Sequence, residues 1–575
     1  MRILLSAMAL GLCLVAPTTF ANWIEKSDAI TLDVLRAQAQ FEPEDVGGNG
    51  LTGFDDQVLD LGPQAFAEYN AVLRAQVARL QGLLDKEKDK HLREDIQILI
   101  EALDEKVARR ELKHATLIPF INVHEFIYQS VRSLLDPRND KSRYPAALER
   151  LARYAGSAEG YEPLVKLAQA RTSERFDVPG LVGPYRGELQ NFLDTAPAYV
   201  DGIRGTLEAS GLEGWEDDFA LLQTQLQAYS DWVGGVLMQH ARESSQLPPE
   251  VYANSLQLWG VESTPAELIE QARYSYQLLN SQMRALAANI AQQRGWEKKD
   301  LRSVIAALKA EQVPPDEVLP MYQQRLAQLE EIIRKKNIVT LPKRDAVIRL
   351  ATEAESAFPA SFMNPPQLIN NTGQYGEFVL VQSNPALGDK GRMDDFSHAA
   401  ITWTLTVHEA RPGHELQFTR MVEGGVSLAR AIFAFNSANV EGWALYAESV
   451  MYPYLPPEGQ LFCLYSLSWR AARMFLDPMV NTGQLSRDGA RDFLMEHMLL
   501  SEPMASSEAD RYAFRLPGQA TSYFYGYRKL MSLRTELEII LGDEFDQRAF
   551  HDFILQQGLL PPGLMREAVL EEFAP

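Results

Sequence analysis

The chain has 575 residues, of which 55 are Lys or Arg and 77 are Asp or Glu, so its formal net charge is −22. Hydrophobic residues make up 46% and charged residues 23%, which is typical of a globular protein with a large core and excludes a collagen, a long disordered chain or a disulfide scaffold. The negative charge argues against nonspecific binding to nucleic acid or to an anionic membrane, because both require basic patches.

The first 21 residues have the plan of a secretory signal peptide. A positively charged start is followed by an almost wholly apolar run, residues 3–16, and by the plausible cleavage site Thr19-Phe20-Ala21. The run is shorter than the ~20 residues of a membrane helix. We therefore expect a periplasmic or secreted protein without stable membrane insertion. A lipoprotein anchored at Cys13 is less favoured because the preceding Leu12 is bulky, and a buried N-terminal helix is the structural alternative.

Residues 22–357 are predicted to form a helical N-terminal region. One helix is expected to begin at Thr264-Pro265-Ala266-Glu267, where Thr264 can cap, Pro265 suits the first helical position and Glu267 completes a capping box. Apolar residues then recur on one face of this helix, which predicts a buried stripe: Leu268, Ala272, Leu279, Met283, Leu286 and Ile290.

The pattern changes near residue 358, where prolines and glycines interrupt any helix. Phe378-Val379-Leu380-Val381 predicts a short strand that closes at Asn384-Pro385, and helical patterning resumes near Phe396. We therefore assign residues 358–575 to a catalytic region that contains a small strand-bearing insert. Because no flexible linker separates it from the N-terminal region, one continuous body is expected.

Residues that suit metal chemistry are concentrated between His408 and Glu441. His408 is followed directly by Glu409, His414 comes six residues after His408, and Glu441 lies farther along the chain. Two histidines and a later glutamate are the ligand types of a catalytic zinc with an open position. A glutamate next to the first histidine is the usual general base of zinc hydrolases. The alternative is that these residues merely fill a helix–helix core.

The spacing of the two histidines requires a distorted helix. In the usual H-E-x-x-H pattern the histidines are four residues apart and share one face, whereas six residues correspond to about 240° on a regular helix. Pro412 and Gly413 lie between them, and proline interrupts a helix while glycine tolerates unusual dihedral angles. We therefore predict a kink or bulge that returns His414 to the side of His408.

Three ordered motifs resemble a bacterial family known as a domain of unknown function, DUF885. They are H-E-x-x-P-G-H at His408, E-G-W-A-L-Y-A-E at Glu441, and P-G-Q-A-x-S-Y from Pro517 to Tyr523. The resemblance is clearest from about Pro359 to Tyr527. It implies a zinc metallopeptidase of the gluzincin type, with His408, His414 and Glu441 as ligands and Glu409 as the catalytic base. One departure is Glu415, where many relatives are expected to have a second histidine.

Supporting roles are expected from residues near these motifs. Tyr523 is the first candidate for stabilising the oxyanion, with Tyr525, Tyr527, Arg511 and Arg528 as alternatives. Glu448 lies two helical turns after Glu441 and could orient a histidine ligand, although a surface or structural glutamate is at least an equal alternative. The strand at Phe378–Gln382 could pair with an extended substrate, or be an ordinary buried strand. His398 could line the cleft, but a lone histidine is more often a structural residue.

The sequence and the resemblance together predict an exported zinc metallopeptidase with a mostly α-helical fold. The resemblance further implies that the helices surround a deep cleft, which would favour short or unfolded peptides as substrates. One alternative is a zinc amidase that acts on a non-peptide or cell-wall amide by the same chemistry. Another, from a different class, is a non-catalytic periplasmic peptide-binding protein on a peptidase scaffold.

Overall fold

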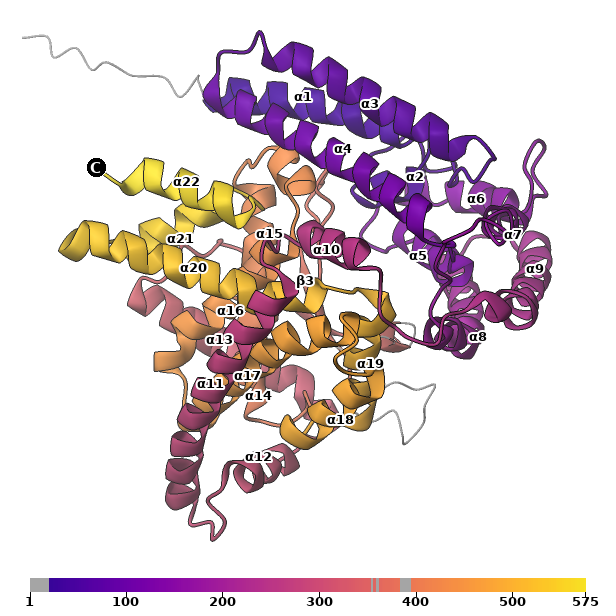
Figure 1. Cartoon of the computed structure of the whole chain (residues 1–575). Helices are drawn as coiled ribbons and strands as arrows, with labels where there is room; N and C mark the ends of the chain where they lie inside the picture. Colours follow the sequence, from indigo (N-terminus) through magenta and orange to yellow (C-terminus); the bar gives the residue numbers. More distant parts are fainter. Residues whose placement is uncertain (1–19, 353–354, 358–360, 383–393) are drawn as a thin grey trace, which may run out of the picture.

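A computed structural model of the chain describes residues 20–352, 355–357, 361–382 and 394–575 (Figure 1). Helices account for 69% of the chain and the strands form one small sheet, which confirms the mostly α-helical class. Residues 1–19 of the predicted signal peptide lie outside the described residues, as do Pro359 and Asn384-Pro385. No helix among the described residues is long and apolar enough to cross a membrane.

The N-terminal helices form two groups with separate hydrophobic cores. The first group is a layer at the top of Figure 1, in which α1, α3 and α4 lie side by side. The second group, α5–α9, lies at the right of the same view and has its own core. The bounds are α1 Phe20–Gln38, α2 Pro43–Gly48, α3 Ala65–Leu84, α4 Lys90–Thr116, α5 Val123–Leu134, α6 Ala146–Ala155, α7 Leu164–Ser173, α8 Arg186–Ser210 and α9 Glu216–Gly235.

Four further helices lead into the body that holds the candidate site. They are α10 Pro249–Leu258, α11 Pro265–Arg294, α12 Leu301–Ala310 and α13 Pro315–Lys336. The predicted capping box of α11 is confirmed, since Thr264 accepts a hydrogen bond from the Glu267 N–H and the Glu267 carboxylate accepts one from the Thr264 N–H. The predicted apolar stripe of α11 packs along α17 in the largest core cluster.

A three-stranded sheet lies beside the segment that carries His408. Its strands are β1 Val347–Leu350, β2 Phe362–Asn364 and β3 Glu377–Leu380, in the order β1-β3-β2. β3 confirms the predicted strand, but it is the central one, parallel to β1 and antiparallel to β2. A strand has only two edges for hydrogen bonding. Because β1 and β2 occupy both edges of β3, a substrate cannot pair with this strand. The hypothesis that a substrate pairs with Phe378–Gln382 is therefore wrong for the part of that segment that forms β3.

The C-terminal helices surround α17, which is buried along nearly its whole length. Their bounds are α14 Ile401–Leu405, α15 His414–Glu423, α16 Ser437–Met451, α17 Pro457–Asn481, α18 Arg487–His497, α19 Glu502–Asp510, α20 Gln519–Leu541, α21 Gln547–Gln556 and α22 Pro562–Phe573. The core around α17 draws on α11 and α12 as well as on the C-terminal helices. The division of the chain at residues 357 and 358 stays a prediction.

Two glycines set how closely α16 and α20 approach. A Cβ on Gly442 would lie 2.6 Å from the carbonyl carbon of Gly526, and a Cβ on Gly526 would lie 1.8 Å from the Ala438 carbonyl oxygen. Only glycine permits this backbone contact. The contact holds Glu441, the neighbour of Gly442, close to the turn of α20 that begins with Tyr523.

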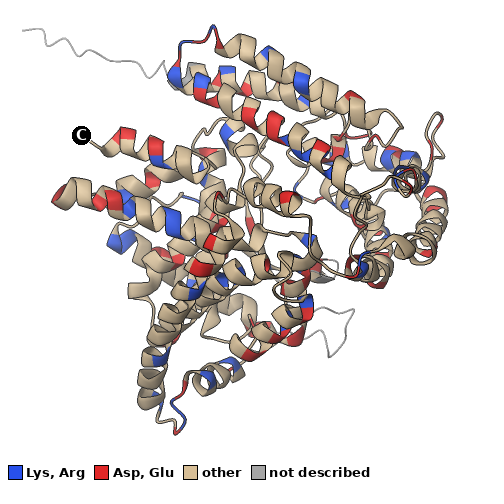
Figure 2. Ribbon diagram, in the orientation of Figure 1, with Lys and Arg blue, Asp and Glu red and all other residues tan. Residues whose placement is uncertain are grey.

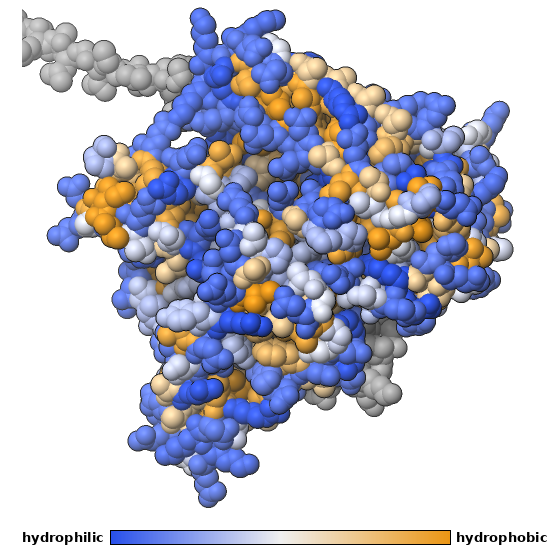
Figure 3. Space-filling view, viewed as in Figure 1, coloured by the Kyte–Doolittle hydropathy of each residue, from blue (hydrophilic) through white to orange (hydrophobic). Residues whose placement is uncertain are grey.

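The surface carries charges of both signs. Figure 2 shows acidic and basic residues interspersed along the outer helices in this view. Figure 3 shows a mostly hydrophilic face with small apolar patches, one of them at the left over the ends of α20–α22. Exposed apolar side chains in those helices include Ile539, Ile540 and Leu564.

Candidate metal centre

The predicted interruption between the two histidines is confirmed. α14 continues into a π-helix, Thr406–Ala410, that carries His408 and Glu409, and α15 begins at His414. The Arg411–Pro412 peptide bond between these elements is cis. A Cβ on Gly413 would lie 1.9 Å from the His408 carbonyl oxygen and 2.3 Å from that of Val407. The chain can double back on itself at this point because residue 413 has no side chain.

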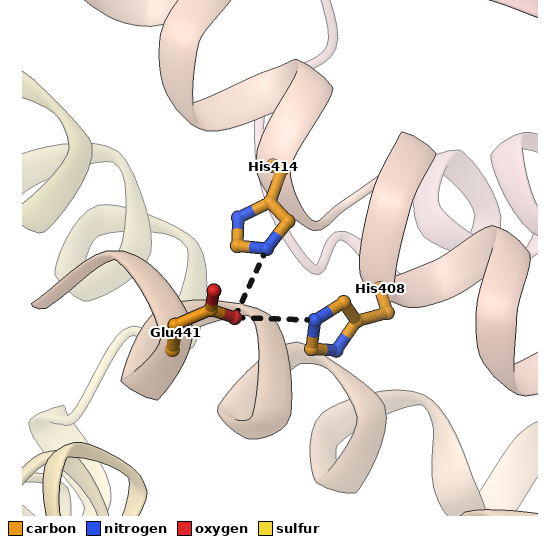
Figure 4. Close-up of side chains that lie close together, drawn as sticks. All are labelled: His408, His414 and Glu441. Carbon is orange, nitrogen blue, oxygen red and sulfur yellow. Dashed lines mark ion pairs between the residues drawn. The ribbon is translucent and has the colours of Figure 1, made fainter. Parts of the chain in front are cut away.

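This turn brings the three predicted ligands together. Figure 4 shows His408, His414 and Glu441 pointing toward one another from three different segments. Glu441 Oε2 lies 3.4 Å from His408 Nε2 and 3.3 Å from His414 Nε2. The two imidazole rings are nearly perpendicular, with centroids 4.8 Å apart. One ligand atom from each residue lies within 4.8 Å of the others, so the three could hold one metal ion.

The donor set and its burial fit a catalytic zinc ion. Two imidazole nitrogens and one carboxylate oxygen form a three-ligand set that leaves a position open. Glu441 Oε2 is buried and accepts no hydrogen bond of good geometry from any described residue, although both imidazoles are close to it. Buried polar atoms without a partner are rare. A cation at the centre of the three side chains would satisfy this oxygen.

Electrostatics at the centre also favour a cation. Burial lowers the pKa of His408, but the carboxylates of Glu441 and Glu448 outweigh it and raise this pKa to about 9. Burial raises the pKa of Glu441, but His414 and His408 hold it well below its usual value. With Glu409, three carboxylates surround the two imidazoles: Glu409 and Glu448 are buried, and Glu441 is mostly buried. A divalent cation would balance this negative charge.

Two side chains of α16 contact the segment that carries the histidine ligands. Glu448 is fully buried and its Oε1 lies 2.7 Å from His408 Nδ1. Of the two alternatives for Glu448, this contact favours the one in which it orients a histidine, and it directs the other ring nitrogen, Nε2, toward Glu441. Trp443 Nε1 donates to the Pro412 carbonyl at 2.9 Å. Sequence reasoning missed the role of Trp443, although its position in the Glu441 motif was a signal.

Glu409 is placed beside the ligands but does not join them. It follows His408 on the π-helix and is 8% exposed. Burial raises its pKa above the usual value, against the lowering effect of His408 and His414. A raised pKa brings a carboxylate nearer to the range in which it both accepts and returns a proton at neutral pH.

Glu415, the departure from the family pattern, belongs to a buried ion network instead of the metal centre. Its Oε2 accepts a hydrogen bond from Arg411 Nε at 2.7 Å, and its Oε1 lies 2.9 Å from Arg344 Nη1. Arg411, which has no exposed surface, also donates to Glu330 Oε1 at 2.5 Å. These contacts hold the backbone at the turn between the two histidines.

The structure separates the candidates for oxyanion stabilisation. Tyr523 is 7% exposed, and its hydroxyl accepts a hydrogen bond from Arg511 Nη2 at 2.7 Å. The Tyr525 hydroxyl instead accepts one from the Glu262 N–H at 3.4 Å, and Arg528 donates to Gln271 in an exposed position. Tyr523 keeps its place as the first candidate, and its catalytic role stays a prediction.

His398 lies apart from the three ligands and has structural contacts. It is fully buried, its Nδ1 accepts a hydrogen bond from the Ile401 N–H at 3.4 Å, and its ring lies against Phe462. Burial lowers its pKa to about 3. These contacts agree with the structural interpretation.

The deep cleft implied by the resemblance stays a prediction. A cavity of about 190 Å³ lies between α1, α2 and α4, where Leu35, Val46 and Lys106 contribute to its lining. None of the three candidate ligands contacts this cavity.

Comparisons with known proteins give the fold and the family. A candidate lipoprotein of unknown function from Shewanella oneidensis is 19% identical, with a TM-score of 0.72 over 96% of this chain and 100% of that chain. A candidate lipoprotein from Colwellia psychrerythraea is also 19% identical, with a TM-score of 0.75 over 96% of this chain and 99% of that chain. At this identity, the likeness shows a shared fold alone.

A third solved structure, a candidate oligoendopeptidase F from Bacillus anthracis, is 10% identical over 87% of this chain and 94% of that chain. Its TM-score of 0.25 is too low to carry an argument. No curated protein matched the chain. The family model described as a bacterial protein of unknown function, DUF885, matches residues 43–569. This protein therefore belongs to the DUF885 family.

Proposed function

We propose that this protein is a zinc-dependent metallopeptidase whose metal ligands are His408, His414 and Glu441. The proposal is carried by one observation: the distorted turn brings these three side chains to a common point and leaves a buried carboxylate oxygen without a hydrogen-bond donor among the described residues. The gluzincin resemblance supports the same ligand set. A peptide is the proposed substrate.

The residues of the chain divide the chemistry between them. A zinc ion held there would supply a Lewis acid that polarises the scissile carbonyl and acidifies a water molecule. Glu409 accepts the proton of the attacking water and passes it to the leaving amine. Tyr523, held by Arg511, donates a hydrogen bond to the developing oxyanion. Glu448 fixes the ring orientation of His408.

Two other functions use the same centre. A zinc amidase acting on a non-peptide or cell-wall amide would need the same three ligands and the same base, Glu409. A panel of peptide and non-peptide amides separates it from a peptidase. A non-catalytic peptide-binding protein would bind peptide without turnover. The buried Glu409 counts against that alternative, because burying a carboxylate beside the ligands is costly and a non-catalytic binding protein gains nothing from it.

Export remains part of the proposal. The predicted cleavage after Ala21 would remove only the first two residues of α1. The Shewanella and Colwellia proteins are described as candidate lipoproteins, which supports keeping Cys13 as an alternative anchor. Intact-mass measurement of the protein recovered from its native host separates the two, because a chain beginning at Asn22 carries no lipid.

The first experiment measures the metal content of the purified protein and of two histidine variants. His414→Ala removes a ligand, whereas His497→Ala removes an exposed histidine on α18 and is the matched control. We expect about one zinc per chain in the wild type and in the control, and none in His414→Ala. A wild type that takes up no zinc would overturn the proposal. Glu409→Gln should then keep the zinc and lose peptide hydrolysis.

A further inference from the structure

Arg470 is a buried arginine that makes no direct contact with a described carboxylate. It lies on α17 and is 9% exposed, and its guanidinium makes no hydrogen bond or ion pair with any described residue. Its Nε is fully enclosed, and the ring of Trp469 lies 4.8 Å from the guanidinium carbon. A buried charge without a partner is costly by several kcal/mol. Such a charge is expected where a ligand supplies the missing anion.

Arg470 lies on the face of α17 that points toward the metal centre. Cys463, two turns earlier on the same face, donates from Sγ to the Glu448 carbonyl oxygen at 3.4 Å. Glu448 in turn contacts the ligand His408. Ser466, one turn before Arg470, has a buried hydroxyl that also lacks a partner among the described residues. Two unpaired donors therefore share the side of α17 that faces α16.

Arg470 has charges of both signs around it: Arg473 repels its guanidinium, whereas Glu448 and Glu508 attract it without a direct ion pair. Arg473 donates to both Glu508 oxygens, at 2.6 and 2.8 Å, and Arg511 Nη1 lies 3.3 Å from the same carboxylate. Both guanidinium groups also lie against the Tyr523 ring, at 4.6 and 5.1 Å from its centre. Two arginines thus pair directly with Glu508, and Arg470 is the third, which makes no direct ion pair with a described carboxylate.

We propose that Arg470 binds a carboxylate of the substrate while the scissile bond lies at the metal centre. The inference rests on the proposed peptidase function, because a peptide is what brings a carboxylate to this position. The planar guanidinium matches a carboxylate in a bidentate geometry, and Ser466 can add a hydrogen bond. The carboxylate is either the free C-terminus of the peptide or an acidic side chain.

The test compares matched peptides on wild-type protein and two arginine variants. The substrates are N-acetylated tetrapeptide pools, prepared as free acids and as C-terminal amides, each with Glu or Gln at the internal positions. Arg470→Met removes the charge, and Arg566→Met, which removes a half-exposed surface arginine, is the control. We measure kcat and KM separately, together with the thermal unfolding temperature.

We expect Arg470→Met to raise KM for the preferred acidic peptide about 10- to 100-fold, the effect of losing a charged hydrogen bond. KM for the matched neutral peptide should stay within about twofold. Preference for the free acid over the amide identifies the C-terminus, and preference for Glu over Gln identifies a side chain. Arg470→Met breaks no direct hydrogen bond or ion pair of a described residue, so its unfolding temperature should stay close to that of the wild type.

Three results would overturn the inference. Equal loss on acidic and neutral peptides would show a general disturbance of the site. Equal hydrolysis of acidic and neutral peptides by the wild type would leave the peptidase function standing without a carboxylate subsite. The third result is that the wild type cleaves neither peptide and Glu409→Gln, measured by calorimetry, binds neither. In that case the proposed peptidase function fails together with the carboxylate subsite.

Discussion

Replacing Gly413 by alanine tests whether the tight turn builds the metal centre. The new Cβ would lie 1.9 Å from the His408 carbonyl oxygen and 2.3 Å from that of Val407. Both neighbours are backbone atoms, so neither can rotate away. To reach an ordinary C···O separation of about 3.3 Å, the Cβ and the His408 carbonyl must move apart by about 1.4 Å. This shift pushes His414 away from His408.

Metal–ligand distances tolerate deviations of only about 0.2 Å, so a shift of this size should disrupt the ligand set. We expect Gly413→Ala to weaken zinc binding at least about 100-fold. Replacing a residue that supports a metal ligand lowers metal affinity by up to about 100-fold, and this change displaces a ligand itself. The metal-free protein should lose about 1–3 kcal/mol of stability, the cost of overpacking a well-packed site.

The assay is zinc titration against a competing chelator, combined with denaturant unfolding of the metal-free protein. Gly205→Ala is the matched control, because Gly205 lies within α8 and a Cβ there would meet nothing within 4 Å. The control should bind zinc normally and be slightly more stable, by about 0.5–1 kcal/mol. Wild-type zinc affinity in Gly413→Ala would refute the argument that the close backbone approach positions His414.

Three further changes probe the surroundings of the site. Glu448→Gln should weaken zinc binding about 10- to 100-fold by loosening His408, while Glu538→Gln on the surface should leave zinc affinity unchanged. Arg411→Met takes one arginine partner from each of two carboxylates, Glu415 and Glu330, and should cost about 3 kcal/mol of unfolding free energy. A loss below about 1 kcal/mol would contradict this. Burial raises the pKa of Glu508, but its arginine partners outweigh it and lower this pKa to about 2. The lowered pKa of Glu508 contributes about 3 kcal/mol to the free energy of unfolding. This contribution is present above pH 4.5 and is lost as the pH falls toward 2. The free energy of unfolding should therefore depend less on pH in Glu508→Gln than in the wild type. An unchanged pH dependence would contradict this role of Glu508.

Local features of this protein follow from the sequence because neighbouring residues decide them. The capping box at Thr264 and Glu267 uses only residues within one helical turn. The break at Pro412 and Gly413 depends on the backbone properties of those two residues. The identities of the three candidate ligands were likewise available, because histidine and glutamate in this order match the chemistry of zinc.

Only the tertiary structure decided which groups meet across the fold. The strand at Phe378 was predicted, but its central position follows from pairing with two segments that sequence patterning does not order. Glu448 was one of two equal alternatives until α16 packed against the π-helix. Arg470 carried no sequence signal, because an arginine on a helix is ordinarily solvated. The physical reason is the same in each case: hydrogen bonds and charges act over a few ångströms, and folding alone determines which distant residues come that close.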